Sequence, residues 1–139
     1  MCGIIGVIGH NKVSSLLIEG LKRLEYRGYD SAGIATLLNG KIDRRRSLGK
    51  IENLKRLLKK SPIKGNVGIG HTRWATHGIP SDANAHPHSD TDNSIAVVHN
   101  GTIDNYLSIR ESLESEGYKF LSESDSEVLP FLISKYYSG

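Results

Sequence analysis

Apolar residues recur along the chain at two kinds of spacing, and each kind predicts a different element. Four segments carry apolar residues three or four positions apart, as on one face of a helix; they cover residues 13–24, 51–61, 106–117 and 128–136. Shorter apolar segments predict strands over residues 2–9, 34–38, 41–48, 67–71, 95–98 and 118–121. The pattern therefore predicts a mixture of helices and short strands.

The clearest predicted turn is Asn39-Gly40, between the second and third strands. Both residues tolerate positive φ, which a two-residue hairpin turn requires. The sheet is therefore expected to be at least partly antiparallel. A second connection, over residues 72–94, is long and rich in His, Pro, Asp and Asn. A connection of that length inside a compact domain is usually functional or disordered.

Single residues add local expectations to this pattern. Residues 2–9 (CGIIGVIG) read as a buried strand, and Gly20 lies on the apolar face of the first helix, where it predicts one tightly packed contact. Ser124 and Glu127 have the spacing of a capping box at the start of the last helix. Pro130 is expected to bend that helix unless its first turn is short or distorted.

Length and composition limit the classes of protein to consider. A chain of 139 residues, 37% of them hydrophobic, is expected to form one modest soluble domain. No apolar run approaches the roughly 20 residues of a membrane helix, so we expect no membrane partner. A single cysteine excludes an internal disulfide and favours a cytoplasmic location.

The positive charge is unevenly placed along the chain. Residues 41–64 hold ten of the eighteen Lys and Arg residues, although the net charge is only +3. Aromatic residues do not alternate with these cations, so the segment favours a solvated or partner-facing surface over nucleic-acid binding.

Cys2 is the first candidate for chemistry, because removal of Met1 would make it the N-terminal residue. A free α-amine titrates near pH 8, close enough to neutrality to accept the proton of the thiol, and the thiolate is the nucleophile. One residue would then supply both the nucleophile and its base. The alternative is that Cys2 is a small apolar residue at the start of a buried strand.

Arg73 is the first of three candidate receptor sites. It follows a predicted strand, with Thr76 and His77 close behind it in the sequence. A guanidinium binds a carboxylate through two parallel hydrogen bonds, so this segment can receive a carboxylate. The alternative is a surface ion pair with Trp74 in the core.

The other two receptor sites are Asn100-Gly101 and Asp125. A side-chain amide next to a glycine N–H offers two donors that can converge on an oxyanion, although Asn-Gly is also a common turn. Asp125 could accept from a substrate ammonium, or it could act as a first-turn acid that favours the helix dipole.

A metal site is the other chemistry that the histidines suggest. The set contains His71, His77, His86, His88 and His99. It has neither HExxH nor C-x-x-C spacing, and His86-Pro87-His88 is expected to spread its side chains apart. We therefore expect neither a metal nor another cofactor.

Six motifs together make the chain resemble a known family. They are Cys2-Gly3-Ile4, residues 25–33 (EYRGYDSAG), residues 71–78 (HTRWATHG), residues 84–88 (NAHPH), residues 98–101 (VHNG) and residues 124–127 (SDSE). In this order, from end to end, they resemble the glutaminase domains of glucosamine-6-phosphate synthases, the glutamine–fructose-6-phosphate aminotransferases (isomerizing). These are class II amidotransferases with an N-terminal cysteine nucleophile. Other class II amidotransferases share the Cys-Gly-Ile start but are not expected to show the longer motifs.

The resemblance implies amide hydrolysis at Cys2. Cys2 would attack the glutamine carboxamide with its own α-amine as proton carrier, and the Asn100 side chain and Gly101 N–H would hold the oxyanion. Ammonia would leave, and water would hydrolyse the glutamyl thioester.

The resemblance also implies how glutamine is bound. Arg73, with Thr76 and His77 nearby, would hold its α-carboxylate, and Asp125 would hold its α-ammonium. Trp74 would belong to a loop that closes over the substrate and excludes water.

The resemblance further implies a four-layer αββα sandwich with mainly antiparallel sheets, of the N-terminal-nucleophile hydrolase type. Residues 1–139 would form a C-terminally truncated glutaminase domain, because the family's domain is longer and is followed by an isomerase domain that binds fructose 6-phosphate. The chain could therefore form a homodimer or associate with the missing part. Two alternatives stay open: a non-catalytic fragment that binds glutamine or a partner subunit, and the glutaminase part of another class II amidotransferase.

Overall fold

The computed structural model describes residues 1–9 and 11–138, and a four-stranded antiparallel sheet lies at its centre. The strands are β1 (Gly3–Ile8), β2 (Ser31–Leu38), β3 (Lys41–Leu48) and β4 (Val67–Arg73), and their order in the sheet is β1-β4-β2-β3. A second antiparallel pair consists of β5 (His88–Ser89) and β6 (Ala96–Val97).

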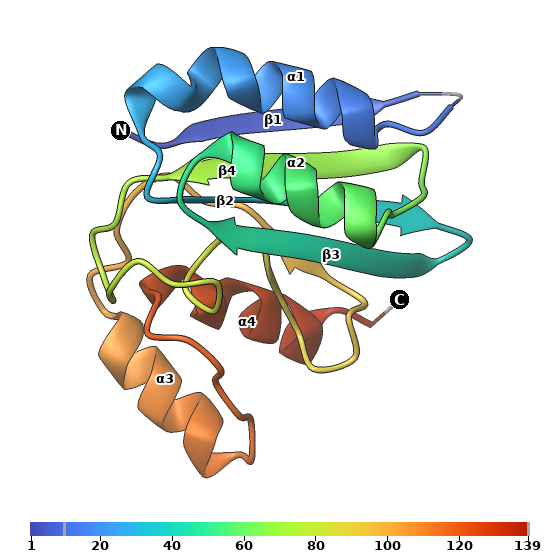
Figure 1. Cartoon of the computed structure of the whole chain (residues 1–139). Helices are drawn as coiled ribbons and strands as arrows, with labels where there is room; N and C mark the ends of the chain where they lie inside the picture. Colours follow the sequence, from blue (N-terminus) through green and yellow to red (C-terminus); the bar gives the residue numbers. More distant parts are fainter. Residues whose placement is uncertain (10, 139) are drawn as a thin grey trace.

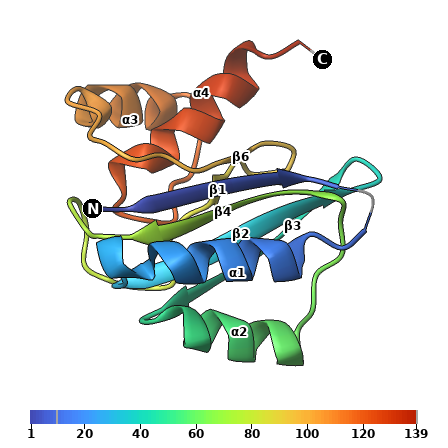
Figure 2. The ribbon, with the colours of Figure 1, turned by 90° about the horizontal axis from the view of Figure 1, so that it is seen from above.

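Helices cover the strands on both sides. They are α1 (Ser14–Leu24), α2 (Ile51–Lys60), α3 (Tyr106–Ser115) and α4 (Val128–Tyr136), with short 3-10 turns η1 (Glu25–Arg27) and η2 (Asp125–Glu127). Helices α1 and α2 lie on one face of the large sheet, and β6, α3 and α4 lie on the other (Figures 1 and 2). This arrangement confirms the predicted α+β class and its antiparallel sheets between helix layers. None of the described helices has the length and hydropathy needed to cross a membrane.

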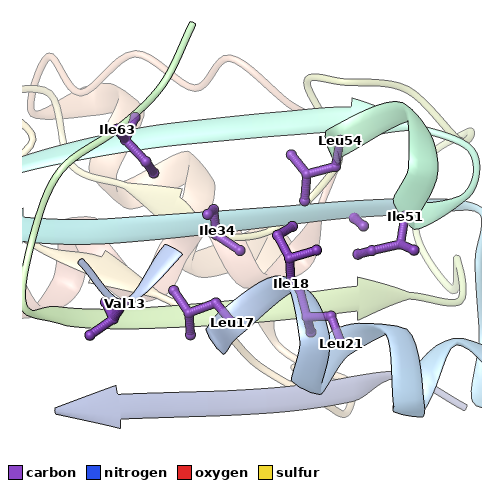
Figure 3. Close-up of a cluster of buried hydrophobic side chains, with 9 residues drawn as sticks. Val13, Leu17, Ile18, Leu21, Ile34, Ile51, Leu54 and Ile63 are labelled. Carbon is purple, nitrogen blue, oxygen red and sulfur yellow. The ribbon is translucent and has the colours of Figure 1, made fainter. Parts of the chain in front are cut away.

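The main apolar core lies between the large sheet and helices α1 and α2 (Figure 3). Its buried residues are Val13, Leu17, Ile18, Leu21, Ala32, Ile34, Ile51, Leu54 and Ile63. A smaller cluster of Leu113, Val128 and Phe131 holds α3 against α4, with Tyr118 and Phe120 edge-on to Phe131. The two sides of the molecule are thus packed around separate apolar clusters.

The predicted hairpin and the predicted close contact are both confirmed. Asn39 and Gly40 have positive φ, at 51° and 75°, and join β2 to β3. A Cβ atom added at Gly20 would collide with Cδ1 at the end of the Ile5 side chain, so any larger residue at position 20 would force that side chain on β1 to shift.

Two strand predictions are wrong. β1 is an edge strand and not a buried one, with Ile4 and Ile8 exposed by 41% and 86%. Residues 118–121 form no strand; they are irregular backbone whose aromatic rings pack on Phe131.

The start of the last helix also differs from the prediction. Ser124 makes no side-chain capping bond, and the Glu127 carboxylate instead accepts from the Leu121 and Ser122 N–H groups. Pro130 lies in the first turn of α4, where no intrahelical N–H bond is required, so the condition under which a bend was expected does not hold.

Candidate active site

A cavity of about 430 Å³ opens where the start of β1 meets the end of β4. Segments far apart in sequence line it: the chain start, η1, the end of β4, the segment after β6 and η2. The lining residues are Met1, Cys2, Arg27, Arg73, Trp74, Thr76, His86, His99, Asn100, Gly101, Thr102, Ser124, Asp125 and Ser126.

Cys2 is placed by the pairing of β1 with β4. Gly3 lies opposite Thr72 in the antiparallel register, and its N–H donates to Thr72 Oγ1 at 3.1 Å. The half-buried thiol of Cys2 accepts from the Trp74 N–H, with Sγ 3.1 Å from N. A free thiol therefore stands at the cavity wall, at the edge of the central sheet.

Arg73 ends β4 and is buried at the same wall. Its Nη2 donates to the carbonyls of His77 and Gly78, and its Nη1 lies 3.9 Å from Asp30 Oδ1. Asp30 also accepts from the Ala75 N–H, so one carboxylate supports both the guanidinium and the loop beyond it. A cation is thus held in place beside the thiol.

Asn100 and Gly101 face the cavity from the segment that follows β6. Asn100 Nδ2 donates to the carbonyl oxygen of Cys2 at 3.2 Å, and its Oδ1 accepts from His71 Nε2 at 2.8 Å. Gly101 has a φ of 144°, in the region that favours glycine. An amide donor therefore lies against the residue that carries the thiol.

Asp125 brings a buried carboxylate to the lining of the cavity. Its Oδ2 accepts from the Ile103 N–H at 2.8 Å, and its Oδ1 lies 3.8 Å from His77 Nδ1. The cavity is thus lined by both a cation and an anion, which suits a zwitterionic ligand such as an α-amino acid.

The structure brings the predicted residues together with one difference. Cys2, Arg73, Trp74, Thr76, Asn100, Gly101 and Asp125 line the cavity, whereas His77 lies outside its lining and contacts Asp125 and the ring of Tyr106. Trp74 is 56% exposed on the loop beside Cys2 and is not a core residue.

Sequence reasoning missed the supporting roles of Asp30, which is partly buried, and of His71, which is fully buried. Each contacts a predicted site residue, Arg73 and Asn100 respectively. Both residues lie in the motifs quoted for the family resemblance, which was the one sequence feature that could have indicated a role at the site. Their partners Arg73 and Asn100 could not be inferred from local spacing.

Three of the five candidate histidines, His71, His86 and His88, pack their rings together. The rings of His71 and His86 are stacked 4.1 Å apart, and His88 packs edge-on to His86 at 4.5 Å. Burial lowers the pKa of His71 to about 4 and holds the pKa values of His86 and His88 well below the usual range. Within residues 1–9 and 11–138, no group of three His, Cys, Asp or Glu side chains is arranged to hold a metal ion.

Comparison with known proteins gives one family and several close relatives. A family model described as a glutamine amidotransferase domain matches residues 59–137. The chain is 58% identical over 139 residues to the glutamine–fructose-6-phosphate aminotransferase [isomerizing] of Clostridium acetobutylicum, and 53% identical over 135 residues to that of Mesorhizobium japonicum. It covers 23% and 22% of those proteins, while 100% and 97% of the chain is matched.

Two solved structures share the fold over the whole chain. The glutamine phosphoribosylpyrophosphate amidotransferase of B. subtilis, complexed with ADP and GMP, superposes with a TM-score of 0.80 at 31% identity. A structure described as the allosteric regulatory enzyme of purine biosynthesis gives 0.82 at 32% identity. The chain corresponds to 30% of each of these chains.

Proposed function

The chain belongs to the family of glutamine amidotransferase domains, and we propose that it hydrolyses the side-chain amide of glutamine with Cys2 as nucleophile. The observation that supports this proposal is the convergence of a free thiol, an amide donor, a buried cation and a buried carboxylate on one cavity. The thiol and the amide donor suit the hydrolysis itself. The cation and the carboxylate suit the α-carboxylate and α-ammonium of the substrate.

The proposed reaction begins once Met1 has been removed. The α-amine of Cys2 takes the thiol proton, and Sγ attacks the carboxamide carbon. Asn100 Nδ2 and the Gly101 N–H hold the resulting oxyanion. Collapse of this intermediate breaks the C–N bond, and the departing ammonia takes the proton from the α-ammonium of Cys2. Water then attacks the thioester, which releases glutamate and restores the thiol.

Glutamine would be bound through the two charged side chains that line the cavity, Arg73 and Asp125. Arg73, with Thr76 and His77 near it, would receive the α-carboxylate, and Asp125 would receive the α-ammonium. Arg73 now donates to neutral main-chain carbonyls, and a carboxylate is a stronger acceptor because its bonds are charge-assisted. The exposed Trp74 would cover the bound substrate.

We propose a wider role from the names of the relatives. The chain spans less than a quarter of the length of the aminotransferases that it matches. The ammonia it releases would serve glucosamine 6-phosphate synthesis in the cytoplasm, with fructose 6-phosphate bound by an isomerase domain outside these 139 residues. Residues 1–139 would thus be part of a glutaminase domain that pairs with that remainder or with a second copy.

Glutamate and ammonia release from glutamine tests this proposal. The protein is purified with Met1 removal verified by intact mass, and Cys2→Ala is expected to abolish release because no nucleophile remains. Trp74→Phe is a control for general damage near the loop and should retain measurable turnover. Calorimetry that detects glutamine binding without ammonia release would overturn catalysis and favour the glutamine-binding fragment.

A further inference from the structure

His71 is a buried histidine whose ring faces the proposed oxyanion donor. It lies on β4, and its Nε2 is 2.8 Å from Asn100 Oδ1 and 3.2 Å from the carbonyl oxygen of His99. The carbonyl oxygen can only accept a hydrogen bond, so Nε2 must carry the proton.

This tautomer determines how the Asn100 amide is turned. A donating Nε2–H requires the amide oxygen of Asn100 to face His71, which leaves Nδ2 directed at the Cys2 carbonyl, 3.2 Å away. Nδ1 of His71 is buried and has no hydrogen-bond partner, which is consistent with a neutral ring that donates only from Nε2. The pKa of His71, lowered to about 4 by burial, keeps that ring neutral near pH 7.

The His71 ring is held so that it cannot turn away. β4 lies between β1 and β2, with Ile4 and Gly33 opposite His71 in the register. His86 covers the ring at 4.1 Å with an angle of 18° between the planes. The Nδ1 of His86 accepts from the His99 N–H at 3.4 Å, so the segment that carries Asn100 is tied to the same stack.

We propose that His71 is a positioning residue that sets the orientation of the Asn100 amide, so that Nδ2 points to the site where the oxyanion forms. The inference rests on the proposed function, because it assigns the support of the oxyanion donor in that reaction. Without the Nε2–H, the Asn100 amide loses one of the two bonds that distinguish its oxygen from its nitrogen, and only the bond from Nδ2 to the Cys2 carbonyl remains. Part of the population would then present an oxygen atom to the developing negative charge.

Two substitutions at His71 separate the hydrogen bond from the bulk of the ring. His71→Phe keeps a planar ring but has no donor, and it should lower kcat for glutamine hydrolysis by about 10- to 100-fold, no more than loss of the oxyanion donor itself. KM should stay within about 2-fold, since the effect is on the transition state. His71→Gln places an amide donor near the position of Nε2 and should recover most of the lost kcat.

Alkylation of Cys2 by iodoacetamide tests whether the nucleophile itself is intact. This displacement needs the thiolate but forms no oxyanion, so His71→Phe and the unchanged protein should react at the same rate. His88→Phe is the matched control, because His88 is as buried as His71 and also has one ring nitrogen without a partner, in its case Nε2. It should leave kcat unchanged even if it lowers stability.

The outcomes separate the inference from the function on which it rests. An unchanged kcat in His71→Phe, or an equal loss in kcat and alkylation rate, would overturn the positioning role while the unchanged protein still hydrolyses glutamine. Failure of His71→Gln to recover kcat would also overturn it. A Met1-free protein that releases no glutamate would overturn the proposed function and the inference together.

Discussion

The two sides of the cavity are stabilised in different ways. Residues 3–73, the sheet half, carry Cys2's strand, Arg73 and His71 on a regular sheet above a core of nine buried apolar residues. Residues 74–138, the loop half, carry Asn100, Gly101 and Asp125 mostly on irregular backbone, above a cluster of three buried apolar residues.

Buried polar side chains replace strand pairing in the loop half. The Asp90 carboxylate accepts from the Ser94 and Ile95 N–H groups, and Asn84 bridges the Ile79 carbonyl to the Glu123 N–H. Each such side chain satisfies main-chain groups that a sheet would otherwise pair. Strand pairing above an apolar core therefore fixes the proposed nucleophile, whereas hydrogen bonds from buried polar side chains fix the loop half.

Leu17→Ala should cause the largest loss of stability. Leu17 is fully buried in the core of the sheet half, so its truncation should lower the free energy of unfolding by about 2–5 kcal/mol through lost burial and a cavity. Urea unfolding followed by circular dichroism measures this loss. Leu16→Ala on the same helix is the control, since Leu16 is 56% exposed and should change stability little. Equal effects of the two substitutions would contradict the proposed importance of this core.

Acidification should lower the stability of the contact between the two halves, where His71 of β4 packs on His86. Native His71 has a pKa of about 4, mainly because it is buried, and an unfolded histidine has one near 6.5. Between these two pKa values His71 is protonated in the unfolded chain and neutral in the native protein. The free energy of unfolding therefore falls as the pH drops below 6.5 towards 4. His71 alone should cost about 2 kcal/mol between pH 7 and pH 5.

His86 and His88 act in the same direction, because burial lowers their pKa values as well. Urea midpoints at pH 7 and pH 5 measure the total loss. His88→Leu should reduce the pH dependence, because one buried imidazole is removed. A urea midpoint that is the same at both pH values would contradict the prediction that His71, His86 and His88 are buried in their neutral form.

Glu127→Gln should have the smallest of the three effects and should be confined to the loop half. The carboxylate accepts from Leu121 N–H at 2.9 Å, Ser122 N–H at 2.8 Å and the Ser122 hydroxyl. An amide weakens these charge-assisted bonds, at a cost of about 1–2 kcal/mol. Hydrogen exchange should accelerate around residues 121–127 and stay unchanged in β1–β4.

Glu111→Gln is the matched control for that substitution, because Glu111 is exposed on α3. It should leave exchange near the wild-type rate throughout. Faster exchange of β4 in Glu127→Gln would show that the two halves unfold as one unit, and would remove the distinction drawn between them.

Sequence periodicity predicted the sheet half better than the loop half. The hairpin at Asn39-Gly40 and the helices near Leu17 and Leu54 follow from local patterns that packing then reinforces. The strand expected over residues 118–121 failed because its aromatic residues pack on Phe131 without a partner strand. The capping box failed because Glu127 reaches back to residues 121 and 122 instead of its own helix end.

The candidate site was predicted from motifs, and its supports were not. Cys2, Arg73, Asn100 and Asp125 were chosen from their chemistry and the family resemblance, and they line one cavity. The role inferred for His71 depends on a hydrogen bond across 29 positions of sequence, which no local pattern encodes. The clustered histidines raised a metal site, which their spacing argued against, but nothing in that spacing predicted a buried ring stack.

Gly33 is a position at which evolution can accept no larger residue without moving the main chain. The carbonyl oxygen of His86 approaches β2 so closely that a Cβ at residue 33 would stand 2.0 Å from it, with Arg45's carbonyl oxygen 3.0 Å away. Any codon change that replaces a glycine adds a heavy atom at this position. Every single-codon replacement of Gly33 would therefore force the main chain at His86 away from β2, and with it the ring that packs on His71.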